Sequence, residues 1–278
     1  MTTKYFDIDI PAIQVPLPLL TELRDLITSH EELFTYILVH GSVSTGEIVP
    51  YSDFDGLLIV KDKYTGSKQL KAFLRASMRR IYRFDPLQHH GWFVIAESQL
   101  ADYDELYLPV EVLRHSKSIY PDNPIRLPVV VNHPVDYRPS FDRMYAALQR
   151  RVGMKWYPKN IYQLKSFLSE IMLLPSLFYA AKYNEAIFKK YSFEKIRPLF
   201  NEEEWHVMAV ASAIREGWCY ELNSFQRYVL HRPGKFLRKW AVRYVAPKIP
   251  DEVEQRIGND FYNSLGMLLS RMKDNLNK

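Results

Sequence analysis

The sequence has a single cysteine, Cys219, and no uninterrupted apolar run long enough to cross a membrane. One cysteine excludes an internal disulfide framework and is typical of a reducing compartment. The longest apolar stretch, residues 171–181, is interrupted by Pro175, and the first residues, MTTKYFDIDIP, lack the apolar core of a signal peptide. Internal repeats and low-complexity segments are also lacking. These absences predict a globular protein of the cytoplasm.

Charge is distributed unevenly along the 278 residues. Hydrophobic residues make up 47% and charged residues 25%, which is enough apolar material for a buried core. Residues 1–150 have 16 Lys and Arg against 19 Asp and Glu, whereas residues 151–278 have 21 against 13. This asymmetry indicates two modules. The basic half suits phosphate-bearing partners, although a basic face can equally serve solubility.

The order of apolar patterns predicts a mixed first half and a helical second half. In the first half, a Pro-rich arm (11–20) and a helix from Leu19 precede apolar runs typical of strands and a basic amphipathic helix; the strands are expected at 34–39, 53–60 and 91–97, and the helix at 68–82. A helix leading into a short strand follows at 110–120, then a Pro-broken connection through 121–134. Later helices are expected at 142–152, 160–183, 184–196, 202–217, 222–230 and 251–275.

This order predicts an α+β fold with a small mixed-sheet head and an all-α helical bundle. We place the head in residues 1–138 and the bundle, with a substrate- or partner-binding role, in residues 139–278.

Two aspartates, Asp53 and Asp55, begin the second expected strand. Residues i and i+2 of a strand project from one face, so these carboxylates point together while Phe54 points to the other side. Adjacent carboxylates repel each other unless a cation lies between them, and Mg²⁺ or Mn²⁺ suits such a pair. Asp-Phe-Asp alone would fit a solvated strand end equally well.

Gly41 and Ser42 follow the preceding strand, and together with the aspartates they suggest a site for a phosphate and a metal ion. Glycine lets a backbone approach a ligand closely, and N–H groups at the start of a helix can hold a phosphate. A phosphate site on one strand end and a metal pair on its neighbour suit attack on the α-phosphate of a nucleotide.

The stretch HGSVSTGEIVPYSDFDGLLIV resembles the signature of the DNA polymerase β-like nucleotidyltransferase superfamily. The shared features are an apolar strand, Gly41-Ser42, a short helix with Gly46, and Ser52-Asp53-x-Asp55 before a second apolar strand. The resemblance implies that Asp53 and Asp55 bind Mg²⁺, and that Gly41 and Ser42, with Ser52 beside the metal pair, bind a nucleoside triphosphate.

Members of that superfamily usually have a third carboxylate on a later strand. GWFVIAE has none in its middle, so the candidates for a third catalytic group are Asp85, His89, His90 and Glu97. Asp85 precedes a proline and could cap a turn, and Glu97 lies at the far end of the strand. A histidine could replace the acid because imidazole titrates near neutral pH. Asp85 and His90 are the leading alternatives.

Two basic segments stand out in the second half, which loosely resembles the bundle of antibiotic nucleotidyltransferases. In AIFKKYSFEKIR, Lys189, Lys190 and Ser192 are candidates to bind the triphosphate. Residues 225–248 interleave basic and aromatic residues, a composition that suits nucleic acid. Both segments also fit solvated helix faces.

We therefore expect a Mg²⁺-dependent nucleotidyltransferase that moves a nucleoside monophosphate from a triphosphate such as ATP to a hydroxyl group. Three acceptors remain open: a small molecule, an RNA end and a protein side chain. The alternative is a catalytically inactive nucleotide- or RNA-binding regulatory module, which the missing third acid favours.

Overall fold

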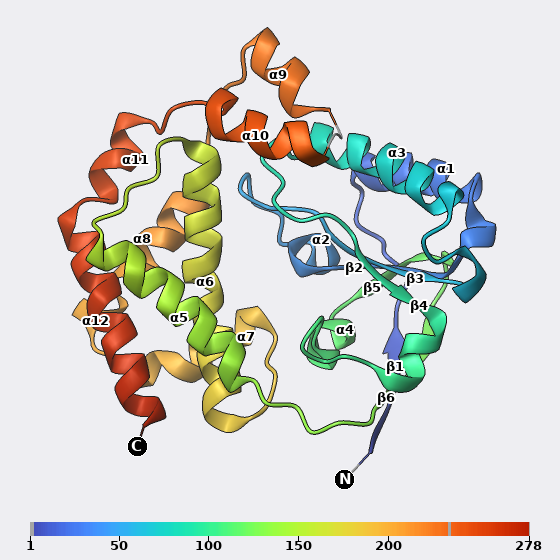
Figure 1. The fold of residues 1–278 in the computed structure, drawn as a ribbon, viewed down its shortest axis with the longest axis horizontal. Helices are drawn as coiled ribbons and strands as arrows, with labels where there is room; N and C mark the ends of the chain where they lie inside the picture. Colours follow the sequence, from blue (N-terminus) through green and yellow to red (C-terminus); the bar gives the residue numbers. More distant parts are fainter. Residues whose placement is uncertain (1–2, 233–234, 278) are drawn as a thin grey trace. The chain divides into compact units, whose positions relative to one another are not determined.

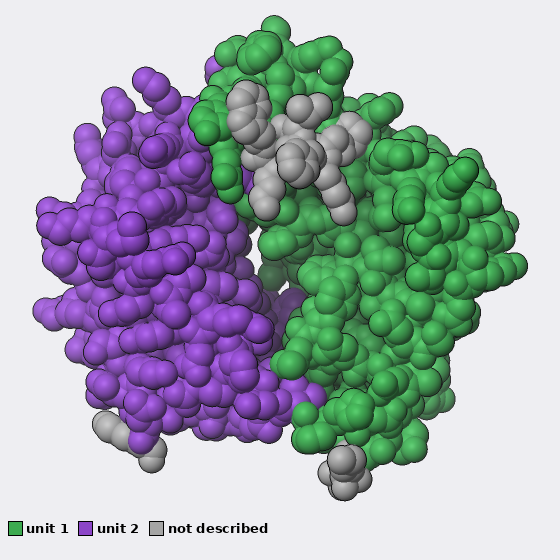
Figure 2. Space-filling view, in the orientation of Figure 1, with its two compact units in different colours: residues 1–134, 222–245 green, residues 135–221, 246–278 purple. Residues whose placement is uncertain are grey.

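The computed structural model describes residues 3–232 and 235–277, which divide into two compact units (Figure 2). Unit 1 comprises residues 1–134 and 222–245, and unit 2 comprises residues 135–221 and 246–278. The first boundary lies close to the expected one at 138. Residues 222–245, however, cluster with the head rather than with the bundle in which we had expected them.

A four-stranded sheet forms the centre of unit 1, in the order β4-β3-β2-β5. Its strands are β2 (Phe34–His40), β3 (Asp55–Val60), β4 (Phe93–Ala96) and β5 (Lys117–Tyr120). β3 and β4 are parallel, and the other neighbours are antiparallel. The mixed sheet confirms the predicted head. β3 and β4 each begin two residues later than expected, so Asp53 lies just before its strand.

Two amphipathic helices, α1 (Pro18–Thr28) and α3 (Lys68–Phe84), pack against each other and cover one face of this sheet (Figure 1). Their buried side chains form one core with the strand residues of that face; the helix residues include Leu19, Leu20, Leu23, Leu70, Phe73 and Ile81, and the strand residues include Ile37, Val39, Leu58 and Val60. Each fully buried side chain of this kind contributes about 1.5–3 kcal/mol to folding. The core therefore holds the strand ends, where the motif residues lie, in fixed positions.

Short elements complete the four-stranded part. They are α2 (Gly41–Thr45), α4 (Val110–Arg114) and three 3₁₀ helices, at Glu31–Leu33, Asp62–Tyr64 and Glu97–Asp102.

A separate two-stranded sheet pairs β1 (Lys4–Ile10) with β6 (Ile125–Val131) in antiparallel register. The expected Pro-broken connection through 121–134 was wrong at this point, since residues 125–131 form a strand. Pro128 lies opposite Asp7 within it. A proline is tolerated there because each strand of a two-stranded sheet has one edge that makes no ladder hydrogen bonds.

Unit 2 is a helical bundle, as predicted. Its helices are α5 (Arg138–Gly153), α6 (Ile161–Tyr183), α7 (Lys189–Ile196), α8 (Glu202–Glu216), α11 (Asp251–Arg256) and α12 (Asn259–Leu276), with a 3₁₀ turn at Arg197–Leu199. The expected helix 251–275 is divided near Gly258, and α7 starts later than the expected 184. α6 continues through Pro175 and is apolar and long enough to span a membrane, but 56% of its most apolar stretch is buried. It is a core helix, consistent with a soluble protein.

α9 (Ser224–Leu230) and α10 (Lys235–Val245) belong to unit 1. The buried side chain of Arg238 on α10 donates hydrogen bonds to the Leu230 carbonyl and, at 2.7 Å, to the Pro86 carbonyl. Its guanidinium also lies 3.4 Å from the centre of the Tyr82 ring on α3. These contacts, which the helical pattern of the sequence does not reveal, attach residues 222–245 to the head.

Candidate functional site

The antiparallel pairing of β2 with β3 brings the two parts of the sequence motif together. His40, the last residue of β2, is the register partner of Asp55, the first residue of β3. Gly41 then starts α2 with φ of +69°, and a Cβ atom added there would lie 2.9 Å from Asp55 Oδ2. The carboxylate of Asp55 therefore lies against the backbone of Gly41, and glycine is required by both the conformation and the space.

On the opposite face of β3, the Trp92 ring packs against the two residues that flank Asp55. Phe54 is buried and meets the Trp92 ring edge-on, with the centres 5.0 Å apart. A Cβ atom on Gly56 would lie 2.3 Å from that ring, and Trp92 Nε1 donates to Ser77 Oγ at 2.9 Å. The structure thus has the alternation of faces that Asp-Phe-Asp predicted. Phe54 and Gly56 face Trp92 in the core, and Asp55 faces the other way.

Gln88 fixes the backbone between the aspartates. Its amide accepts from Phe54 N–H at 2.9 Å and donates to the Phe54 carbonyl at 2.8 Å and the His90 carbonyl at 3.0 Å. The side chain is buried, so these bonds are shielded from water. Gln88 was not among the residues predicted from the sequence, where its only signal is a position beside paired histidines.

His40 is the second residue that the sequence analysis missed. Its side chain is buried, and burial lowers its pKa; the neighbouring Asp55 carboxylate opposes this effect and His90 adds to it. His40 Nε2 has no hydrogen-bond partner among the residues that the structure describes. A neutral imidazole with an unused buried nitrogen beside Asp55 is therefore a candidate to contact a ligand.

The first residue of β4, Phe93, places an aromatic side chain on the face of the sheet that carries Asp55. β4 runs parallel to β3 with Phe93 paired to Leu57, so Phe93 faces the same side as Leu57 and Asp55. Its ring lies 5.5 Å from that of His40 and 5.4 Å from that of Tyr107. The four residues of β4, Phe93–Ala96, include no Asp or Glu, so this strand supplies no carboxylate beside Asp55.

Glu97 is not brought to the aspartates, and Asp85 takes part in a turn. Asp85 is buried at the end of α3, where Oδ1 accepts from Leu87 N–H at 3.0 Å, so it forms the turn that its place before a proline suggested. Glu97 follows the C-terminal end of β4, whereas Asp55 lies at the N-terminal end of the parallel β3. Glu97 therefore lies at the other end of this strand pair from Asp55, whereas a catalytic role for Asp85 stays a prediction.

Of the four candidates for the third group, His90 is best placed. It is exposed, and it is one of the groups that lower the pKa of His40. The His89 ring lies 6.4 Å from that of His90. The Gln88 amide, which donates to the carbonyls of both Phe54 and His90, also keeps the His90 backbone close to the residue between the aspartates.

Two carboxylates would hold a divalent cation only together with ligands from outside the chain. Within residues 3–232 and 235–277, no group of three or more His, Cys, Asp or Glu side chains could hold a metal. Mg²⁺, however, is commonly bound by one or two carboxylates together with substrate phosphates and water. The Asp55 carboxylate at the glycine backbone and the unused nitrogen of His40 leave polar groups for such a ligand.

The two motif serines have different surroundings. Ser52 is buried, and its hydroxyl accepts from Val49 N–H at 3.0 Å, which closes the turn before Asp53. Ser42 lies in the first turn of α2 and is partly exposed. The expected triphosphate contact therefore suits Ser42 better than Ser52. Gly46 ends α2 in the left-handed conformation, with φ of +74°.

The expected triphosphate residues of the second half lie on α7 of unit 2. Ser192 is fully buried, and its hydroxyl donates to the Lys189 carbonyl at 2.7 Å and lies 3.1 Å from Ser176 Oγ. Its expected role in phosphate binding is corrected, because this hydroxyl is engaged inside the bundle. Lys189 is half-buried and Lys190 is exposed at the start of the helix.

The sequence was compared with protein families and with curated proteins. No family profile matches the chain, and no curated protein matches it.

Proposed function

We propose that unit 1 binds a nucleoside triphosphate with Mg²⁺ or Mn²⁺ and transfers its nucleoside monophosphate to a hydroxyl group of an acceptor. One observation carries this proposal: the Asp55 carboxylate lies against the backbone of Gly41, with Oδ2 2.9 Å from the position of a Cβ atom. The two halves of the nucleotidyltransferase-like motif therefore meet at Gly41 and Asp55, which supports a shared site. ATP is the first triphosphate to test, and the exposed Cys219 fits a cytoplasmic protein.

Each group has a defined role in this proposal. Asp53 and Asp55 hold the cation, which, when bound, neutralises charge on the phosphates and polarises the α-phosphate. Gly41 and Ser42 lie beside the phosphates. The acceptor hydroxyl oxygen bonds to the α-phosphorus, the bond to the bridging oxygen breaks, and pyrophosphate leaves. His90 takes the hydroxyl proton in place of the usual carboxylate.

The second candidate function is a nucleotide-binding regulatory module without catalysis. Phe93 favours it, because this side chain on the Asp55 face of β4 has no oxygen atom that could ligate a divalent cation or accept a proton. In that case triphosphate binding would still depend on Asp53 and Asp55.

A transfer assay separates these functions. The protein is incubated with Mg²⁺ or Mn²⁺, each α-labelled triphosphate, and RNA, protein or hydroxylated small molecules as acceptors. The control for Asp53→Asn/Asp55→Asn is Asp7→Asn/Asp9→Asn, which removes an equally spaced, exposed pair from β1. Transfer that survives in the control and disappears in the Asp53/Asp55 variant supports the enzyme. Triphosphate binding without transfer supports the regulatory module, and absence of both contradicts the proposal.

A further inference from the structure

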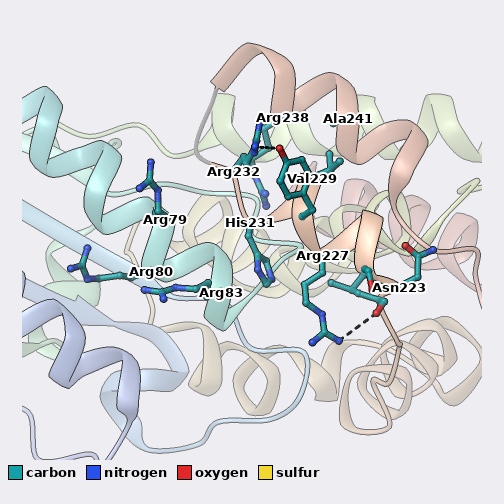
Figure 3. Close-up of a pocket in the computed structure, with 13 residues that line it drawn as sticks. Arg79, Arg80, Arg83, Asn223, Arg227, Val229, His231, Arg232, Arg238 and Ala241 are labelled. Carbon is teal, nitrogen blue, oxygen red and sulfur yellow. Dashed lines mark hydrogen bonds between the residues drawn. The ribbon is translucent and has the colours of Figure 1, made fainter.

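An arginine-lined groove with a volume of about 1510 Å³ lies within unit 1, between α3 and the α9–α10 segment. α3 contributes one set of basic side chains, and α9 with the residues just after it contributes another (Figure 3). The residues concerned are Arg79, Arg80 and Arg83 on α3, and Arg227, His231 and Arg232 on the facing segment.

The positive charge of this groove is only partly balanced. Neither α3 nor residues 222–245 contains an Asp or Glu, and among the residues that the structure describes no acidic side chain lines the groove. Glu22 of α1 pairs with Arg83 at 2.7 Å and lies 3.9 Å from Arg80. In the part of the chain that the structure describes, no carboxylate forms an ion pair with Arg79, Arg227 or Arg232.

Several guanidinium groups that line the groove lie close to the His231 ring. Burial lowers the pKa of His231 first, and the guanidinium groups of Arg227, Arg238 and Arg83 lower it further. Arg238 is held in place by the carbonyls of Leu230 and Pro86. The fold therefore holds several positive charges close together. A bound anionic ligand would relieve the repulsion between them.

Exposed aromatic rings on α9 and α10 indicate which class of anion the groove binds. Phe225, Tyr228 and Tyr244 are 65%, 60% and 72% exposed, and Tyr228 lines the groove. The Arg232 guanidinium lies 3.9 Å from the centre of the Tyr228 ring. Guanidinium groups bind phosphates in pairs of hydrogen bonds, and aromatic rings stack on unpaired bases. This combination is typical of surfaces that bind single-stranded nucleic acid.

We infer that this groove binds the backbone of a single-stranded polynucleotide, with Arg79, Arg227 and Arg232 at phosphates and Tyr228 stacked on a base. That the groove binds such a strand follows from the groove alone. That this strand is also the acceptor of the nucleoside monophosphate rests on the proposed function. The two sites share one loop of unit 1, since Arg238 binds the Pro86 carbonyl and Gln88 holds Phe54.

Fluorescence anisotropy with labelled RNA and DNA strands of about 12 nucleotides tests the inference. Arg79→Gln/Arg227→Gln should bind about tenfold more weakly than the wild type and should flatten the log–log salt dependence by about 1.4, since each phosphate contact contributes about 0.7. The control Arg114→Gln/Arg126→Gln removes two charges of unit 1 outside the groove and should bind like the wild type. Circular dichroism verifies that each variant is folded.

Further arms separate the alternatives. Preference for RNA or DNA identifies the source of the strand, and either preference supports the inference if a duplex of the same length binds more weakly. Equal binding of duplex, polyglutamate or anionic lipid vesicles would overturn it, as would equal loss in the control variant. Asp53→Asn/Asp55→Asn should bind the strand like the wild type, so failure of the groove and failure of the proposed nucleotide site give different results.

Discussion

The Gln88 side chain holds the backbone of Phe54 at both its N–H and its carbonyl group, at 2.9 and 2.8 Å. Phe54 separates the two aspartates, so this pair of hydrogen bonds sets the backbone from which Asp53 and Asp55 project. The loop that carries Gln88 thereby becomes part of the proposed site without contacting a ligand.

Gln88→Leu should damage both stability and the site. The substitution leaves buried polar groups of Phe54 without partners, which should lower the free energy of unfolding by about 1–3 kcal/mol. ATP affinity in the presence of Mg²⁺ should fall as well. Urea unfolding and titration with a fluorescent ATP analogue measure the two effects.

Gln99→Leu is the matched control for that experiment. Gln99 also accepts a backbone hydrogen bond, from Ala96 N–H at 2.7 Å, but it is exposed and lies at the far end of β4. It should leave ATP affinity unchanged. Equal loss of affinity in the two variants would contradict the positioning role of Gln88.

Two glycine substitutions test how much the close approach of the Asp55 carboxylate to the Gly41 backbone matters. Gly41 and Gly46 both have positive φ, but a Cβ atom on Gly46 would come no closer than 4.0 Å to Val15 Cγ2. Each substitution by alanine should cost about 1–2 kcal/mol for the backbone conformation. Gly41→Ala should additionally displace the Asp55 carboxylate and abolish ATP binding, whereas Gly46→Ala should retain it. Equal ATP affinities in the two folded variants would show that the contact at Gly41 is unimportant.

The arginines around His231 should set its titration. Its pKa lies below the ordinary value of 6.5, through burial and then Arg227, Arg238 and Arg83. Arg83→Gln should raise the pKa of His231, and Arg79→Gln, which also removes a groove charge, should change it less. NMR titration of the His231 ring measures both, and a larger shift in Arg79→Gln would be the contrary result.

The same pKa shift has a consequence for stability. The unfolded chain takes up the His231 proton before the folded one as pH falls, so this histidine lowers the stability between pH 6.5 and its lowered folded pKa. His231→Gln should therefore lose less stability than the wild type over that interval, as measured by urea unfolding at several pH values. An unchanged pH dependence would contradict this expectation.

Arg238 should hold the α9–α10 segment on the head. Arg238→Met removes the donors to Leu230 and Pro86, which should destabilise the segment by about 1–3 kcal/mol and expose it to limited proteolysis. Arg243→Met changes an exposed arginine of the same helix and should leave the cleavage pattern unaltered. Cleavage at the same rate in both variants would show that Arg238 is not the anchor.

The sequence predicted those parts of the fold that depend on local patterns. Apolar runs located β2 and β3, and helical spacing located α3, α6 and α8. The pairing of β1 with β6 and the return of residues 222–245 to the head depend on contacts between segments far apart in the chain, and a local pattern carries little information about them. Arg238 shows the reason: its character as a buried anchor depends on Tyr82 and Pro86, more than 150 residues away.

The candidate site divides in the same way. The spacing of Gly41 and Asp55 predicted a shared site, and the register of β2 with β3 brings these residues together. The search for a third acid could not be settled from residues 85–97, because the face of each side chain depends on how β4 aligns with β3. That alignment puts Phe93 on the face that carries Asp55, and the contacts of His40 with Phe93 and of Gln88 with Phe54 depend on the same packing.

The most direct test of the account is the binding of Mn²⁺ with and without ATP, measured by electron paramagnetic resonance. The wild type and Asp7→Asn/Asp9→Asn should bind Mn²⁺ far more tightly when ATP is present, because the aspartate pair binds the cation together with phosphates. Asp53→Asn/Asp55→Asn should lose this effect while remaining folded. If that variant bound Mn²⁺ and ATP as the wild type does, Asp53 and Asp55 would not be the metal pair, and the account would be wrong at its centre.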